Sequence, residues 1–292
     1  MMMMITALLT SMMMLAGAGF TTVTTQRDFQ ERDETNQTFQ LGPGARVDVS
    51  SIRGPVEVVT GDSTTAEVRI IRTARTRADL EYHKIKVEQV GNSLVVRGIQ
   101  DPEERRRENV QVNHHVILKV PRSINLSVSS ISGAVKANDL DGQTHLSSIS
   151  GSVNVGNVGD KLEVSSVSGN LDIGNVGAET HLNSISGNVE LGQVNGPLDV
   201  SSVSGSLNVT LVSLSPQGVH IRSVSGSIEM RFKSDINADF SAEDVSGQVY
   251  LDMSNVTRDR DGKSPNVRAR IGGGGTPIRI SSVSGDIRLT RS

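Results

Sequence analysis

The sequence predicts an all-β chain: a two-sided β-solenoid with coils of about 18 residues, preceded by a more irregular β-rich section. A Ser-x-Ser-Gly motif ends at Gly133, Gly151, Gly169, Gly187 and Gly205, at steps of 18 residues. Apolar and polar residues alternate on both sides of each glycine, which is typical of strands with one buried face. Aromatic residues make up only 2% of the chain, so Val, Ile and Leu must fill the core.

The first residues have the pattern of a secretory signal peptide. Residues 1–20 carry no charged side chain, and small residues at 16–18 offer a cleavage site. We therefore expect a signal peptide over 1–18, a polar flexible leader over 19–36, and an extracytoplasmic location (periplasmic, cell-surface or secreted). A buried N-terminal strand or helix is the alternative for this segment. After cleavage, no remaining stretch is long and apolar enough to span a membrane.

Residues 37–123 are expected to form the β-rich N-terminal section. One coil is predicted inside it, because Val47, Val49, Ile52, Gly54 and the residues after them match the repeat position for position. Longer strands are expected near residues 66–73, 83–90, 93–99 and 110–120. Residues 101–108 are rich in charge and are interpreted as a solvated loop.

Residues 124–292 are expected to form the regular solenoid, which brings the stack to roughly eight coils. Counted from its glycine as zero, each coil has apolar residues at −7, −5, −2, +2, +4 and +7. The break in alternation before −2 predicts a corner at the Ser-Ser pair and a buried residue at −2. Val167→Asp should therefore greatly reduce the free energy of unfolding, whereas Ser165→Ala should reduce it only slightly. A second corner is expected at the Gly-Asn pairs at +5 and +6, where Asn side chains can bond to neighbouring backbone.

The end of the chain breaks the regular period. Residues 252–267 interrupt the repeat, and Gly272 begins a run of four glycines that suggests a flexible excursion. The last strand pair, near residues 278–289, is expected to close the stack.

Charge and cysteine content exclude several classes of partner. The formal net charge is −3 with both signs mixed, so no basic footprint for nucleic acid or an anionic membrane is present. The chain has no Cys, which excludes disulfides and thiolate metal sites. The repeats therefore predict no cofactor.

One column of polar residues is the candidate metal site. Position −6 alternates imidazole and carboxylate groups on successive coils, which could bind a divalent metal, respond to pH, or serve as cross-strand ion pairs on a solvated face. Its chemistry-bearing members are His145, Glu163, His181, Asp199 and His220, with Ser127 and Ser241 at the two ends. His114 and His115 adjoin in a predicted strand, so they should point to opposite faces and not share a metal.

A polysaccharide-active enzyme is the alternative that the sequence leaves open. Position +3 places Asp172 and Glu190 on adjacent coils, flanked by Asn154 and Asn208, and a pair of carboxylates is the minimum for glycoside hydrolysis. No aromatic platform for sugars accompanies them. The repeated Ser-x-Ser-Gly lacks the context of a nucleophile elbow, so no catalytic residue is predicted.

The repeats resemble a bacterial family of exported β-strand-repeat proteins, labelled "putative adhesin" and catalogued as a domain of unknown function. The matching features are Leu118-Lys119-Val120-Pro121, the repeats from Leu126 onward, and the ending that runs from Ile271 through four glycines to Ser-Val-Ser-Gly. The resemblance covers about residues 38–290 and implies a β-repeat architecture without catalytic residues.

The favoured function is a non-enzymatic extracytoplasmic protein that binds a polymer, a surface or a partner through repeated polar faces. Repeats present the same chemistry at a fixed spacing, which suits multivalent contact. The alternative is a periplasmic structural or envelope-stress scaffold that binds a protein partner.

Overall fold

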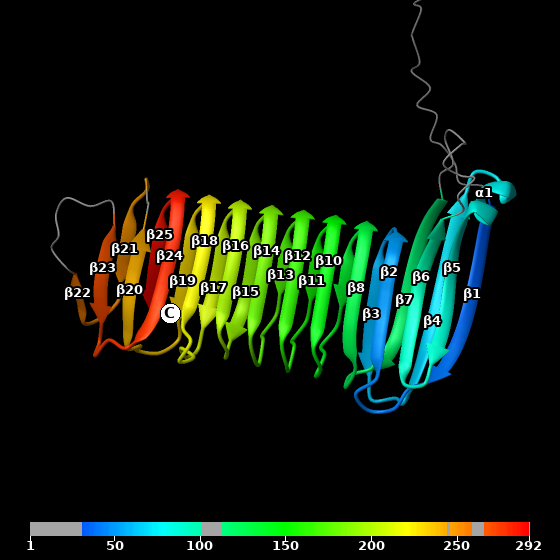
Figure 1. The fold of residues 1–292 in the computed structure, drawn as a ribbon, viewed down its shortest axis with the longest axis horizontal. Helices are drawn as coiled ribbons and strands as arrows, with labels where there is room; N and C mark the ends of the chain where they lie inside the picture. The colour runs from blue at the N-terminus through cyan, green and yellow to red at the C-terminus, as the bar shows by residue number, and fades with distance from the viewer. Residues whose placement is uncertain (1–30, 101–111, 244–245, 259–265, 292) are drawn as a thin grey trace, which may run out of the picture.

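Backbone hydrogen bonds between successive repeats join the chain into two long sheets that face each other (Figure 1). The structure is a computed structural model that describes residues 31–100, 112–243, 246–258 and 266–291. One sheet has 13 strands and the other 12, so the two-sided all-β prediction is confirmed. The predicted signal peptide and the charged loop at 101–108 lie outside the described residues.

Each regular coil contributes one longer strand to the 13-stranded sheet and one strand to the 12-stranded sheet. Parallel pairing in register joins each strand to its equivalent in the next coil, as the 18-residue period predicts. The longer strands are β8 (Asn125–Ser132), β10 (Thr144–Ser150), β12 (Leu162–Ser168), β14 (Thr180–Ser186), β16 (Leu198–Ser204) and β18 (Val219–Ser225). Their partners in the other sheet are β9 (Val135–Ala137), β11 (Val153–Val155), β13 (Leu171–Ile173), β15 (Val189–Val194), β17 (Leu207–Leu211) and β19 (Ile228–Phe232).

The N-terminal section contains the predicted first coil and extends both sheets at one end of the stack. That coil is β2 (Arg46–Arg53) and β3 (Val56–Gly61), which pair with β8 and β9. The other strands are β1 (Glu31–Gln40), β4 (Thr65–Ala74), β5 (His83–Val90), β6 (Ser93–Gln100) and β7 (Val112–Pro121).

Two features of this section differ from the sequence analysis. Strand β1 begins at Glu31, inside the expected flexible leader, because its backbone pairs with β4 over its whole length. A short helix, α1 (Arg77–Tyr82), was not predicted; Thr76 and Asp79 cap its N-terminus reciprocally.

The C-terminal part corrects the expected order of the last coils. Strand β24 (Thr276–Ser284) lies between β18 and β20 (Ala238–Glu243), and β25 (Ile287–Arg291) lies between β19 and β21 (Val249–Asp252). The final strand pair is therefore inserted into the stack and does not close it. At this end β23 (Val267–Ile271) pairs antiparallel with β20, and β22 (Val256–Arg258) pairs with β23.

The four glycines before β24 form a bonded turn, where a flexible excursion was expected. The Gly273 amide donates to Asn237 Oδ1 at 2.7 Å, and the Gly275 amide donates to Asp239 Oδ2 at 3.1 Å. Gly272, Gly274 and Gly275 all have positive φ, which glycine adopts without a steric penalty.

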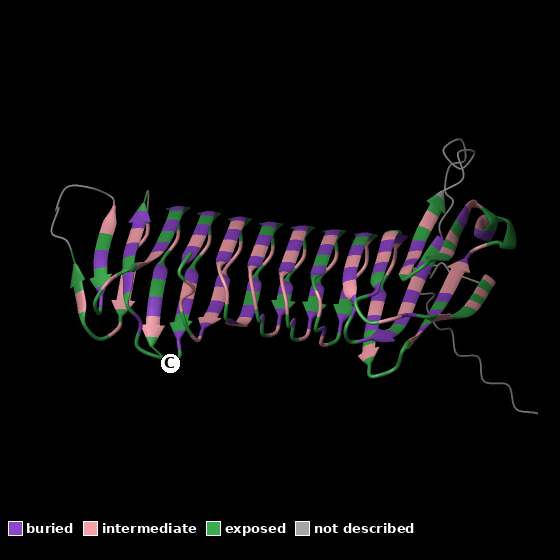
Figure 2. Cartoon of the chain, turned by 60° about the horizontal axis from the view of Figure 1, so that its bottom comes forward, coloured by how far each residue is buried: buried purple, intermediate pink, exposed green. Residues whose placement is uncertain are grey.

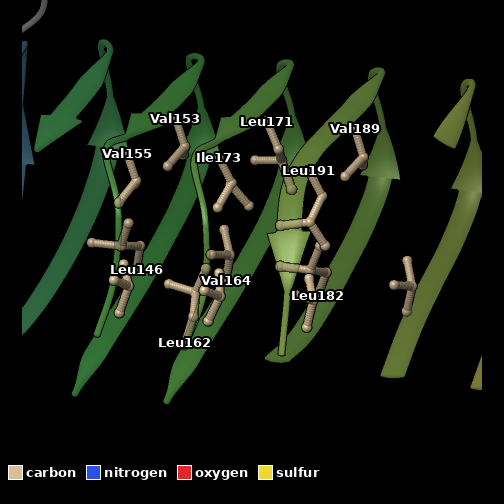
Figure 3. Close-up of a cluster of buried hydrophobic side chains, with 14 of the residues drawn as sticks. Leu146, Val153, Val155, Leu162, Val164, Leu171, Ile173, Leu182, Val189 and Leu191 are labelled. Atoms are coloured by element: carbon tan, nitrogen blue, oxygen red, sulfur yellow. The ribbon is translucent and has the colours of Figure 1, made fainter. Parts of the chain in front are cut away.

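The core consists of aliphatic ladders between the two sheets (Figure 3). The residues at −7 and −5 of the longer strands and at +2 and +4 of the shorter ones are buried, as predicted. One coil shows the pattern with Leu162, Val164, Leu171 and Ile173, each no more than 2% exposed. Parallel pairing brings identical positions together, so each ladder buries its apolar surface only when its neighbours are present.

The predicted corner at the Ser-Ser pair is wrong. Each longer strand runs straight through this pair, so alternation continues and position −3 points inward. Ser166 is 4% exposed, whereas Val167 at −2 is 44% exposed, and the other regular coils repeat this arrangement. In the first coil Ile52 is buried, because Ser51 has a φ of 59° and the register shifts beside it.

The bend between the two sheets depends on the glycine at position zero. Gly169 has a φ of 134°, and a Cβ there would lie 2.3 Å from the carbonyl oxygen of Gly151 in the preceding coil. Glycine therefore satisfies two requirements at once, a positive φ and a close approach between backbones.

The second corner carries the predicted amide ladder. Asn157 donates its backbone amide to Asp139 Oδ1 at 2.8 Å, and Asn175 donates its backbone amide to Asn157 Oδ1 at 3.0 Å. The Gln193 amide continues the series to Asn175 Oδ1 at 2.9 Å. Each side-chain oxygen thus accepts a hydrogen bond from a backbone N–H in the turn of the next coil.

Gly169→Ala should reduce the free energy of unfolding by at least about 2 kcal/mol, because the new Cβ meets a backbone carbonyl and the φ is strained. Gly61→Ala is the matched control: nothing lies within 4 Å of its Cβ position, and a change below about 1 kcal/mol is expected. Urea unfolding of both variants measures the difference. Equal midpoints would contradict the role of the bend.

The corrected phase of the strand makes a second prediction. Val164→Asp buries an unpaired charge and should cost more than about 4 kcal/mol, whereas Val167→Asp should cost less than about 1 kcal/mol. The melting temperatures of the two variants check this. If Val167→Asp lowered the melting temperature as much as Val164→Asp, the phase predicted from the sequence, with Val167 buried, would be the correct one.

Candidate binding face

The outer face of the 13-stranded sheet, from β8 to β24, presents three parallel columns of side chains. Alternation along each strand sends positions −6, −4 and −2 outward. Figure 2 shows the resulting bands of buried and exposed residues across neighbouring strands. We call this surface the outer face.

The −6 column is assembled as the sequence predicted over five strands. His145 pairs in register with Glu163, Glu163 with His181, and the register continues to Asp199 and His220. Beyond His220 the next member is Arg279, because β24 is inserted between β18 and β20. Ser241 therefore neighbours Arg279 and not His220, which corrects the predicted order.

The ion pairs of this column do not form a continuous ladder. His145 Nδ1 lies 3.4 Å from Glu163 Oε2. His181 Nε2 instead lies 2.8 Å from Oε1 of Glu179, a neighbour on its own coil, and Lys161 Nζ lies 3.0 Å from the other oxygen of that carboxylate. These hydrogen bonds, led by the one from Lys161, hold the pKa of Glu179 below its usual value.

The geometry of this column suits solvated ion pairs. Side chains of the bonded members are 37–48% exposed. Within the residues that the structure describes, no three His, Asp or Glu side chains gather closely enough to hold a metal ion. Exposed pairs of this kind contribute little to stability, because water and salt screen them.

A ladder of exposed aliphatic side chains occupies position −2. Sequence reasoning missed it because it assigned these residues to the core. We call it the aliphatic ladder: Ile131, Ile149, Val167, Ile185, Val203, Val224 and Val283, which are 39–55% exposed. Period-two counting carried through the Ser-Ser pair would have found it.

A groove runs beside the aliphatic ladder. Its volume is about 600 Å³, and position −4 forms one side of it with Ser147, Ser165, Asn183 and Ser201. Position −2 forms the other side, from Ile149 on β10 to Val283 on β24. Arg222 is the one charged residue among the described residues that line it.

The two carboxylates of the enzyme alternative lie on the opposite sheet. Asp172 and Glu190 pair in register on β13 and β15, as the +3 column predicted, and both are exposed. Asn154 donates its side-chain amide to Asp172 Oδ2 at 3.0 Å. Their face is separate from the groove, which lies on the 13-stranded sheet.

The two adjacent histidines point to opposite faces, as predicted. His115 Nε2 lies 3.5 Å from Glu57 Oε1 on the surface, whereas His114 is 3% exposed. The His114 ring packs edge-on against the buried ring of His83, with centroids 5.9 Å apart. Burial lowers the pKa of His114 to about 4, and the electrostatic interactions with His83, Arg72 and Arg53 act in the same direction.

Fold and surface together define the class of protein: a two-sided, parallel β-solenoid with a laddered outer face. The model of the Toastrack DUF4097 family matches residues 46–290, and the chain belongs to this family. The match covers the first coil and the whole regular stack. Among curated proteins none matches the chain.

Solved structures with a similar course of the chain share little sequence with it. A protein from Bacteroides fragilis NCTC 9343 described as a "putative adhesin" is 14% identical, with a TM-score of 0.46 over 88% of this chain and 97% of its own. A "Putative lipid binding protein" from Parabacteroides distasonis ATCC 8503 is 12% identical, with a TM-score of 0.41 over 88% of this chain and 96% of its own. Likenesses this weak decide nothing about function. No helix among the described residues is long and apolar enough to cross a membrane.

Acid should destabilise the N-terminal section through His114. Its folded pKa of about 4 lies below the unfolded value of 6.5, so its contribution is fully present above pH 6.5 and is lost as the pH falls toward about 4. The expected loss of unfolding free energy across this window is on the order of 2–3 kcal/mol. Urea unfolding at about pH 7.5, 5.5 and 4.5 measures it.

His114→Leu is the variant that tests this assignment. It removes the titrating ring and should flatten the pH dependence of stability between these values. His145→Leu, on the exposed column, should leave the dependence as in the parent. An unchanged slope in the His114 variant would contradict the assignment.

Proposed function

We propose that this chain is a non-enzymatic extracytoplasmic protein of the cell envelope or cell surface that binds through its outer face. The observation that supports this most directly is the repetition in register of three columns, one charged, one of small polar residues and one aliphatic, over consecutive coils. A rigid array with a fixed spacing of about 4.8 Å suits an elongated ligand or a surface with many weak contacts.

The absence of enzymatic activity is part of the proposal. Asp172 and Glu190 lie exposed on a sheet of short strands. Glycoside hydrolysis needs one carboxylic acid held protonated in a shielded site, and an exposed pair supplies no such shielding. The enzyme alternative requires Asp172→Asn with Glu190→Gln to abolish a polysaccharide-cleaving activity, and an activity that this double change left intact would exclude the two carboxylates as its site.

The apolar start of the sequence supports export, and protease shaving of intact cells tests the location. An epitope tag between Pro216 and Gln217 suits this experiment, because both residues are exposed in the connection between β17 and β18. Cleavage on intact cells is expected for a surface protein.

A lysed sample controls for intrinsic cleavability of the tagged connection. Protection in intact cells with cleavage after release of the periplasm would favour the scaffold alternative, in which the outer face binds an envelope protein. Recovery of the intact tag only in the cytoplasmic fraction, with the N-terminal segment uncleaved, would overturn the proposal.

A further inference from the structure

The groove on the outer face is long and straight, and positions −4, −3 and −2 of successive strands line it. It extends over the consecutive strands from β10 through β18 to β24. At about 4.8 Å between neighbouring strands, these five steps give a length of about 24 Å. Figure 1 shows the same strands side by side, without a break or a change of direction.

One wall of the groove exposes apolar surface that nothing among the described residues covers. Ile149, Ile185 and Val283 are each more than half exposed, and they stand in one row with three further valines. Contiguous apolar surface of this kind is costly in water, and rows that join neighbouring exposed side chains into one patch are typical of interaction sites.

A folded protein partner fits this wall poorly. Specific protein interfaces bury roughly 1,200–2,000 Å² and depend on aromatic or Arg anchors that fill separate pockets. The described lining of the groove holds no aromatic residue, and its ladder of Val and Ile offers the same contact at every step. Nothing in such a row fixes the register of a partner.

An amphipathic helix laid along the groove also fits poorly. The helical pitch is about 5.4 Å, whereas the ladder repeats at about 4.8 Å. Over five steps the two repeats drift apart by about 3 Å, more than half a ladder spacing. A helix therefore cannot pack its apolar ridge into the whole row.

An extended alkyl chain meets all of these constraints. It is narrow, straight and apolar, and identical methylenes need no register against the ladder. A bilayer core of about 30 Å accommodates two acyl chains end to end, so about 24 Å of groove is ample for one. Each methylene removed from water then adds to the affinity in the same way.

Charge places the head group of such a ligand. Arg222, the one charged residue of the described lining, stands on β18 near the β24 end of the groove. Its side chain is 67% exposed, with Nη1 3.5 Å from Asp199 Oδ1. Arg279 lies on the neighbouring strand β24, opposite His220 in the −6 column, so a second cationic residue stands near the same end of the groove.

We infer that the groove binds one extended acyl chain of an anionic amphiphile, with the chain along the aliphatic ladder and the head group at Arg222. This rests on the proposed function and names the ligand of the same face. The apolar row supplies the affinity, and the arginine end sets the direction of the bound chain.

Calorimetric titration with saturated fatty acids of about 8, 12 and 16 carbons, below their micelle concentrations, tests the inference. We expect the Kd to fall about tenfold or more between about 12 and 16 carbons, because each added methylene leaves water. The triple variant Val167→Ser, Ile185→Ser, Val203→Ser should bind at least about tenfold more weakly. These residues are exposed, so the fold should survive their change, and circular dichroism checks that it does.

Two further variants make the result specific. Arg222→Gln should weaken binding of the acid several-fold and leave binding of the primary alcohol of equal length unchanged. The triple variant Asn154→Ser, Asp172→Ser, Glu190→Ser lies on the opposite sheet and should bind like the parent chain.

Three results would overturn the inference. The first is an affinity that does not depend on the length of the acyl chain. The second is an affinity of the Val167, Ile185, Val203 triple variant equal to that of the parent protein. The third is self-association of the protein that this variant abolishes and that fatty acid does not compete with. The titration uses purified chain and is independent of the shaving experiment, so failure of one leaves the other interpretable.

Discussion

Parallel hydrogen bonding between identical positions of successive coils is the constraint on which the rest of the structure depends. It requires the strands of successive coils to turn at the same places, while the longer connection between β17 and β18 places its extra residues outside the paired strands. The glycine at position zero permits this turn, since a Cβ there would collide with the carbonyl of the coil before it. At the other corner, the side chains of Asn157 and Asn175 each accept a hydrogen bond from the backbone of the next coil, which holds that turn in the same place. Once coils are fixed in register, every inward position becomes a core ladder and every outward position becomes a surface column.

That constraint also explains why the surface is repetitive in chemistry. An outward Val or Ile in one coil is aligned with its equivalent in the next. A single exposed side chain of this kind would have little effect, but the aligned row forms a continuous apolar wall. The same alignment makes the −6 column a row of small, local ion pairs, in which His181 bonds Glu179 on its own coil. The apolar column is therefore the stronger candidate for ligand binding, because its contributions add along one straight line, whereas exposed charges are screened.

The two ends of the stack depart from the regular coil, and each does so through antiparallel pairing. At the N-terminal end β1, β4 and β7 extend one sheet while β5 and β6 extend the other, with His83 and His114 buried in this section. Arg72 joins β4 to its surroundings there, donating to the carbonyls of Leu80 and His83 at 2.9 and 3.0 Å and pairing with Asp33. At the C-terminal end the inserted β24 and β25 leave β20 to β23 as the outermost strands. Edge strands thus belong to irregular segments, which interrupts the pattern that would otherwise favour end-to-end growth.

The sequence by itself determined the all-β class, the 18-residue coil, the first coil near Val47, the inward ladders at −7, −5, +2 and +4, and the corner at the Gly-Asn pairs. These follow from local periodicity and from backbone conformations that few residues tolerate. Three features were decided only by the tertiary structure. Whether the strand bends at Ser165-Ser166 depends on how the two sheets meet, and the straight strand places Ser166 inside and Val167 outside. The position of β24 between β18 and β20 is a long-range pairing choice that no local pattern records. The groove exists only because separate coils align their exposed side chains, which is a property of the stack and not of any one repeat.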